Sequence, residues 1–187
     1  MKKIKLVVLM TMLLGATLLN ADTYGKQNYF GFNPFGLLFN IYSGEYGRFL
    51  DAEGTTEINI PFYATIWDNI NAYGIGAKYR IYKDGNGEGV FYGGGLKLSM
   101  LTWEWDFSYW NGSTWVNDPE KVSWTTITPL GELGYRWSWA NGWTIAPSLE
   151  LGFDVSTYEE ENSDWGSPSN GESGLHWGLN LGVAYMF

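Results

Sequence analysis

The last thirteen residues of the chain constrain its fold more than any other stretch. From Leu175 to Phe187, every second residue is apolar or aromatic, and the residues between them are small or polar except for Met186. Period-two alternation over this length predicts one long β-strand with an apolar face and a polar face. Such a strand needs an apolar environment on one side only.

The same alternation recurs along most of the chain and predicts an antiparallel sheet. We expect seven clear strands, at residues 35–50, 56–67, 72–82, 90–103, 123–137, 143–155 and 175–187. Tight turns separate several of them, since "KDGNG" at 83–87 and "SWANG" at 138–142 contain residues that tolerate positive φ. Two connections are longer, at 104–122 and 156–173. Short turns that alternate with long loops are typical of barrels that cross a membrane.

A closed barrel of this kind usually has an even number of strands. We therefore expect an eighth strand before the first clear one, from Tyr24–Pro34. Pro61 lies inside an otherwise clean strand and cannot donate a ladder hydrogen bond, so we expect a bulge or a locally open pair there. The predicted fold class is all-β: an eight-stranded antiparallel up-and-down transmembrane β-barrel.

Residues 1–21 have the pattern of a secretory signal peptide. Lys2, Lys3 and Lys5 precede an apolar centre at 6–19, and Ala21 offers a small residue at the cleavage site. The apolar centre is shorter than the roughly 20 residues that a membrane-spanning helix needs. Its removal would leave one domain at 22–187 with a net charge of −12 instead of −9, which argues against a nucleic-acid partner. The chain has no cysteine, so disulfides and thiolate metal sites are excluded.

The alternation alone allows two kinds of barrel. A soluble cup would turn its apolar face inward around a ligand, whereas a membrane barrel would turn that face outward. The polar faces carry few charges and many glycines, which is unusual for strands that face water. Aromatic residues gather near one end of the apolar faces, at Tyr135, Trp137, Trp143, Tyr185 and Phe187. Because aromatic girdles mark the lipid–water boundary, we expect lipid outside and polar side chains inside.

Charged residues on the polar faces form the candidate site. Counted from the periplasmic end of each strand, some of them lie one or two residues up and the others four to seven residues up. Opposite charges at matched heights predict pairing across the barrel interior. These residues are Glu45, Glu57, Lys78, Arg80, Lys97, Glu132, Arg136 and Glu150. An eight-stranded barrel is just wide enough for side chains to fill, so we expect a structural network in a filled polar lumen rather than a pore. Within it, we expect Glu132 to pair with Lys97 or Arg136.

With its leading apolar segment, alternating strands and terminal "AYMF", the chain resembles small outer-membrane β-barrel proteins of the OmpA-barrel and OmpX type. The segment "NPFGLLFNIYSGEYGRFL" and the "GYRW" at 134–137 are similar to sequences of a widespread family of such barrels. The resemblance implies a bacterial outer-membrane location among lipid and lipopolysaccharide. It also implies insertion by the barrel-assembly machinery through the C-terminal strand that ends in Phe187.

The residues and the resemblance together predict a structural or surface-interaction role, with no catalytic residues, metal or cofactor. Trp105, Trp110 and Trp115 lie in a long connection, where they could contact a sugar or a partner, or extend the outer girdle and the strands above the membrane. Two alternatives stay open. One is a carrier of small apolar molecules, which would need an open lumen or a lateral gap near Pro61 or Pro129, and the other is an enzyme that modifies lipid A.

An enzyme of that kind would need the single histidine of the chain. Lipid A deacylase barrels resemble this chain in size and use a His-x-Ser pair, but here His176 is followed by Trp177 and Gly178. Ser173 precedes His176 by three residues, and residues three apart in a strand point to opposite faces. We therefore expect His176 to be an inward polar side chain near the outer rim.

Overall fold

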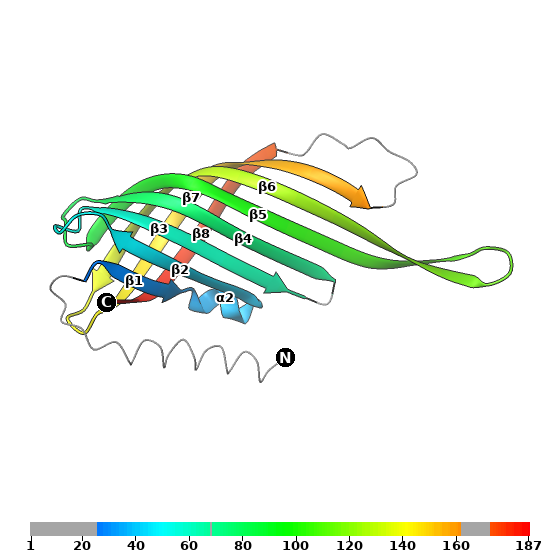
Figure 1. Cartoon of the computed structure of the whole chain (residues 1–187), viewed down its shortest axis with the longest axis horizontal. Helices are drawn as coiled ribbons and strands as arrows, with labels where there is room; N and C mark the ends of the chain where they lie inside the picture. The colour runs from blue at the N-terminus through cyan, green and yellow to red at the C-terminus, as the bar shows by residue number, and fades with distance from the viewer. Residues whose placement is uncertain (1–25, 68, 162–172) are drawn as a thin grey trace.

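The computed structural model describes residues 26–67, 69–161 and 173–187. Its strands close into one antiparallel barrel in sequence order, with β8 beside β1 (Figure 1). The elements in the described ranges are β1 (Asn28–Phe32), α2 (Pro34–Leu38), β2 (Ile41–Phe49), β3 (Thr56–Ile66), β4 (Ile70–Tyr82), β5 (Gly89–Trp110), β6 (Trp115–Ser138), β7 (Trp143–Glu161) and β8 (Ser173–Met186). The predicted all-β, eight-stranded antiparallel fold is confirmed, and the eighth strand comes from the expected segment. The predicted signal peptide at 1–21 lies outside the described residues.

The two ends of the barrel differ. The short turns at 50–55, 83–88 and 139–142 lie at the end where β1 begins and β8 finishes, which we call the short-turn end. There the backbone amide of Phe187 donates to the carbonyl of Asn28, with 2.8 Å between nitrogen and oxygen. At the opposite end, which we call the hairpin end, β5 and β6 run on well past their neighbours (Figure 1).

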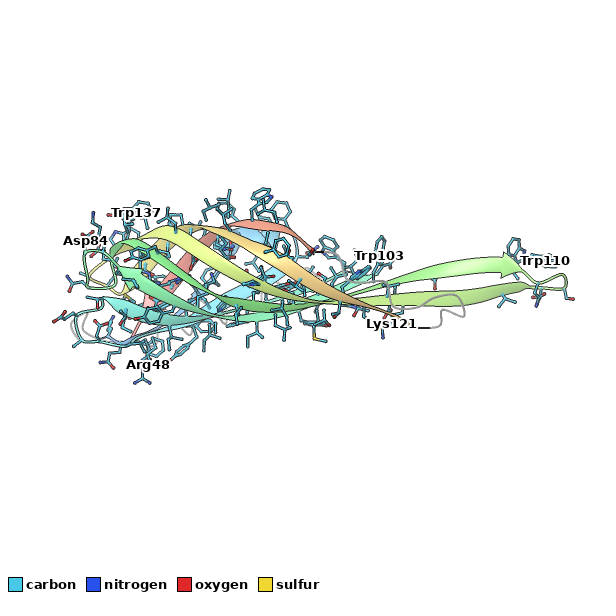
Figure 2. All side chains as sticks on the ribbon, turned by 90° about the horizontal axis from the view of Figure 1, so that it is seen from above. Arg48, Asp84, Trp103, Trp110, Lys121 and Trp137 are labelled. Atoms are coloured by element: carbon cyan, nitrogen blue, oxygen red, sulfur yellow. The ribbon has the colours of Figure 1, made fainter. Side chains whose placement is uncertain are left out.

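This extension corrects the prediction of a long loop at 104–122. β5 and β6 stay paired out to Trp110 and Trp115, so the connection is a tight turn at 111–114. Beyond Trp103, where the pairing with β4 stops, the two strands project as a ribbon (Figure 2). The alternation of aromatic and polar residues in "WEWDFSY" at 103–109 is a period-two signal that predicts this strand. β7 likewise continues to Glu161, into the other segment that we expected to be a loop.

The predicted strand at 35–50 is wrong in its first part. Asn33 caps a short helix, because its side-chain oxygen accepts hydrogen bonds from the backbone amides of Phe35, at 3.0 Å, and Gly36, at 3.4 Å. Pro34 suits the first helical turn, where an amide proton has no partner to bond. Asn40 then adopts a positive φ of 59°, which turns the chain into β2.

The expected local opening at Pro61 is confirmed. Asn59 pairs with Lys78 and Phe62 pairs with Ile75 in the same register, but the two rungs between them are missing. A proline has no amide proton to donate, so the ladder opens without a shift of register. The β6–β7 pairing opens in the same way opposite Pro147 and at Pro129.

The two faces of the barrel are sorted as the sequence predicts. Leu149 and Leu179 lie on the outer surface, with 39% and 74% of their area exposed, whereas the side chain of Glu132 inside the barrel is fully buried. Other large apolar side chains on the outer surface include Ile75, Leu96 and Leu151. The apolar faces therefore point out and the charged faces point in. No helix in the described part of the chain is long and apolar enough to cross a membrane.

Candidate functional site

Glu57 is the centre of the charged cluster in the lumen. It lies at the start of β3 near the short-turn end and is completely buried. Its Oε1 accepts from the hydroxyl of Tyr29 at 2.6 Å and from Nη1 of Arg80 at 3.0 Å. Its Oε2 accepts from the hydroxyl of Tyr82 and from Nη1 of Arg136, both at 2.7 Å. Charge-assisted bonds of this length are among the strong ones in proteins, so one carboxylate holds two guanidinium groups in place.

A second group of charges lies next to Glu57. Glu132 accepts from Nζ of Lys78 at 3.1 Å and from Nε of Arg80 at 2.8 Å, and Lys78 also pairs with Glu150. The expected pairing of Glu132 with Lys97 or Arg136 is therefore wrong. Lys78, Glu132 and Glu150 were counted at one height and do meet. Lys97 was counted at that height too but does not reach Glu132, because strands that tilt and stagger shift residues relative to one another.

Arg80 joins these two groups and a third carboxylate. Its Nη2 lies 3.4 Å from Oε2 of Glu45, which also accepts from the side-chain amide of Asn59 at 2.8 Å. Seven of the eight predicted residues thus form one connected set, in which Arg136 is joined to the others through Glu57. Lys97 stands apart from this set.

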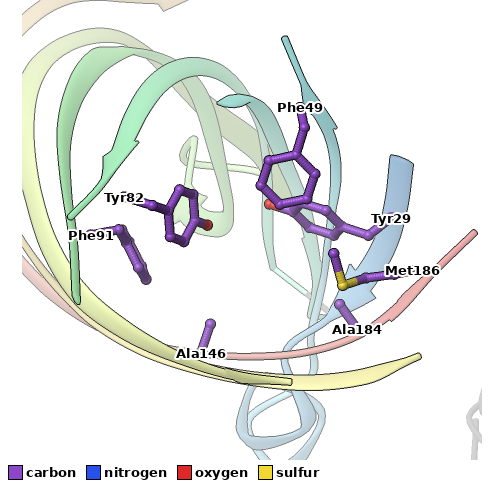
Figure 3. Close-up of a cluster of buried hydrophobic side chains, with 7 residues drawn as sticks. All are labelled: Tyr29, Phe49, Tyr82, Phe91, Ala146, Ala184 and Met186. Atoms are coloured by element: carbon purple, nitrogen blue, oxygen red, sulfur yellow. The ribbon is translucent and has the colours of Figure 1, made fainter. Parts of the chain in front are cut away.

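Aromatic rings pack beneath the charges at the short-turn end. Tyr29, Phe49, Tyr82 and Phe91 face inward and are buried side by side, together with Met186 (Figure 3). Their ring centroids lie 5.4 to 6.4 Å apart in successive pairs. This layer was not predicted. The usable signal was that Phe49, Tyr82 and Phe91 lie next to turns and alternate in step with the polar face of their strands.

Arg136 contacts this aromatic layer in addition to Glu57. Its guanidinium carbon lies 4.4 Å from the ring centre of Tyr29 and 5.1 Å from that of Tyr82. Its Nε and Nη2 atoms are buried and have no hydrogen-bond partner among the described residues. Glu57 is thus its anionic partner, and stacking over rings provides the remaining attraction.

Lys97 belongs to a separate polar chain further toward the hairpin end. Its Nζ lies 3.0 Å from Nε2 of His176, and Nδ1 of His176 lies 3.3 Å from Oδ2 of Asp154. Thr128 in turn donates to Asp154. His176 faces inward as predicted, and Ser173 begins β8 on the opposite face, so the two do not form a catalytic pair. In the described residues, no group of three or more His, Cys, Asp or Glu side chains is placed to hold a metal ion.

Two glycines make room for inward-facing tyrosine rings. A Cβ on Gly47 would lie 1.9 Å from Cε1 of Tyr29, and a Cβ on Gly74 would lie 2.1 Å from Cε1 of Tyr63. Both glycines face the lumen on strands that otherwise carry side chains there. The close approach of the Tyr29 ring to β2 is therefore possible only because Gly47 has no side chain.

The tip of the β5–β6 ribbon carries an exposed aromatic pair. Trp110 and Trp115 are 55% and 69% exposed and meet edge to face, with 5.9 Å between ring centroids. Asn111 shapes the turn by accepting from the backbone amides of Ser113 and Thr114, and Gly112 adopts a φ of 95°. The backbone of Trp105 pairs with Glu120 along the shaft of the ribbon.

At the short-turn end, Asp51 organises the β2–β3 turn. It accepts a hydrogen bond from the hydroxyl of Thr56, and its two oxygens accept from the backbone amides of Thr55 and Thr56 at 2.8 Å. The Thr56 hydroxyl and then the Thr55 amide favour the charged form, which lowers the pKa of Asp51 from 3.8 to about 2.

Comparisons with known proteins give one likeness in structure. No family model matches the chain, and no curated protein matches it. The chain is similar to the N-terminal β-barrel domain of Pseudomonas aeruginosa OprF, at 14% sequence identity and a TM-score of 0.43. That similarity covers 87% of this chain and 96% of the OprF domain.

Proposed function

We propose that the chain is an integral β-barrel of the bacterial outer membrane, with a lumen closed by its own side chains and a structural or surface-contact role. The observation that carries this proposal is the sorting of side chains. Apolar residues cover the outside of a closed barrel, and the paired charges lie inside it. A soluble protein rarely exposes so much contiguous apolar surface, whereas a bilayer requires it.

The closed lumen rests on the packing at the short-turn end. Glu57, Arg80, Arg136 and Glu132 are all nearly or fully buried, and the aromatic layer lies beneath them. An ion would have to break several charge-assisted hydrogen bonds to pass this layer. In planar lipid bilayers, we expect the refolded protein to show no stepwise conductance. Regular ohmic channels from the parent protein would overturn the closed lumen.

The surface role rests on the ribbon. Beyond Trp103 it extends for about 20 Å, since a strand rises ~3.3 Å per residue, and it ends in the exposed pair Trp110 and Trp115. With the short turns on the periplasmic side, as in known outer-membrane barrels, the ribbon would stand outside the cell. Lipid, lipopolysaccharide and the assembly machinery acting on the C-terminal strand are the partners that this placement implies.

Single cysteines test the location and the orientation together, because the chain has none of its own. Ser113→Cys at the ribbon tip should react with a membrane-impermeant maleimide on intact cells. The matched control Glu53→Cys, an exposed residue in the β2–β3 turn, should react only after lysis. Equal labelling of both sites on intact cells would contradict the proposed orientation, and the absence of both from the outer-membrane fraction would contradict the location.

A further inference from the structure

The wall of the barrel is incomplete beside α2. β1 is only five residues long, and it pairs with β8 only from Val183 to Met186. The remainder of β8, at 173–182, has β7 on one side and no strand on the other among the described residues. α2 contacts both β2 and β8 and lies at the end of β1, where the neighbouring wall would continue (Figure 1).

An inner cavity and an outer groove both border this place. The inner cavity has a volume of about 130 Å³ and is lined by lumen residues that include Lys97, Glu45 and Glu150. The outer groove is lined by apolar residues that include Phe35, Leu179 and Leu149. Four residues line both the cavity and the groove: Asn33, Ser148, Asn180 and Leu181. We call these four residues the neck, because they border both the polar lumen and the apolar outside of the barrel.

Most of the polar groups in the cavity that can still form hydrogen bonds are donors. Glu45 and Glu150 are engaged by Arg80 and Lys78. Lys97 contacts His176, and no described carboxylate lies within ion-pair distance of it. Asn180 in the neck makes no side-chain hydrogen bond to another described residue. An ammonium group carries three donors and a side-chain amide carries two, so the cavity suits a group that accepts hydrogen bonds.

We propose that this opening binds a single-chain amphiphile with a carboxylate head, such as a fatty acid. The head lies in the inner cavity near Lys97 and Asn180, and the hydrocarbon chain leaves through the neck into the groove under Phe35. This assignment rests on the proposed position of the barrel in a bilayer.

A photoreactive palmitate tests the site in the mature protein refolded into lipid nanodiscs. The diazirine is placed next to the carboxylate, so that a bound head labels the lumen and a free lipid labels the outer surface. We expect adducts on the β8 and β5 peptides that contain Asn180 and Lys97. Adducts spread evenly over all strands would overturn the proposal.

Two variants on one face of one strand test the neck. Asn180→Phe fills it and should lower the adduct yield about tenfold, equivalent to one order of magnitude in affinity. Gly174→Phe is the matched control, because it faces the lumen on the same strand six residues away, and a Cβ there would meet nothing within 4 Å. Its yield should stay within about twofold of the parent, a change too small to mark a lost contact. Equal adduct yields from both variants would overturn the proposal that the ligand passes through the neck.

Lys97→Gln tests whether the head group is a carboxylate. It also tests the site as a whole if Asn180→Phe does not fold. Palmitate labelling should fall about tenfold, because a charge-assisted hydrogen bond is lost. Labelling by the matched photoreactive hexadecanol should not change. Equal loss for both probes would overturn the carboxylate assignment. A folded barrel is recognised by its heat-modifiable shift in gel mobility. If the parent protein inserts and shows this shift but is not labelled selectively, the proposed site is refuted and the proposed function is not. If the parent protein never enters the discs, the proposed function is refuted as well.

Discussion

Replacing Glu57 by glutamine should destabilise the barrel more than any other single isosteric change in the lumen. The substitution keeps the size of the side chain and removes its charge. Nη1 of Arg136 donates only to Glu57, and two further nitrogens of that guanidinium already lack partners among the described residues. Tyr29 and Tyr82 also donate to the Glu57 carboxylate, and a side-chain amide cannot accept from all four donors.

The expected loss in the free energy of unfolding depends on which partners the buried cations keep. Removing one partner of a buried ion pair typically costs about 3–5 kcal/mol, because the other charge stays buried. The glutamine oxygen can still accept one hydrogen bond from Arg136, so we expect a loss near ~3 kcal/mol, at the lower end of that range. Glu132→Gln should cost less, because Lys78 keeps Glu150 and Arg80 keeps Glu57.

Urea unfolding in detergent micelles or lipid vesicles measures these differences, with tryptophan fluorescence and the gel shift as probes. The double variant Glu57→Gln, Arg136→Gln should be more stable than Glu57→Gln alone, because it removes the stranded charge. The reasoning is refuted if Glu57→Gln lies within about 1 kcal/mol of the parent, the size of an ordinary surface change. It is also refuted if Glu132→Gln proves the more damaging of the two.

Three further predictions concern single elements. Asp51→Asn should lower the free energy of unfolding at pH 7. Because the folded pKa of Asp51 is about 2 and its ordinary value is 3.8, this difference should shrink as the pH falls from about 4 to 2, measured by urea titrations at each pH. Gly47→Ala should destabilise by displacing a buried tyrosine ring, whereas Gly174→Ala, whose Cβ would meet nothing within 4 Å, should not; equal unfolding midpoints would show that the ring adapts. The double variant Trp110→Ala, Trp115→Ala should leave the gel shift and unfolding midpoint unchanged, because the pair lies beyond the barrel, and a large loss of stability would contradict that independence.

Short-range patterns were sufficient to predict most of the strands and the direction of their faces. Leu149 and Glu150 are neighbours in sequence and point to opposite sides, a relation that follows from the pleat of any strand. The same rule predicts that His176 faces inward. The β5 segment of the ribbon at 103–109 obeys this rule as well. The richness of 104–122 in Trp, Tyr and Asn favoured a loop, whereas the two-residue alternation of aromatic and polar residues indicates a strand.

Strand positions predicted only part of the pairing inside the lumen, such as that of Glu57 with Arg80 and Arg136. Glu132 meets Lys78 and Arg80 across the barrel rather than Lys97, and Lys97 meets His176 on β8. Which residues of distant strands come together depends on the stagger and tilt of the closed sheet, and on how far each long side chain reaches. The short β1 and the helix α2 also depend on a local competition, in which Asn33 and Pro34 favour a capped turn over an extended strand. Alternation is a property of neighbouring residues and can be read along the chain, whereas contacts across the barrel exist only once all eight strands have closed.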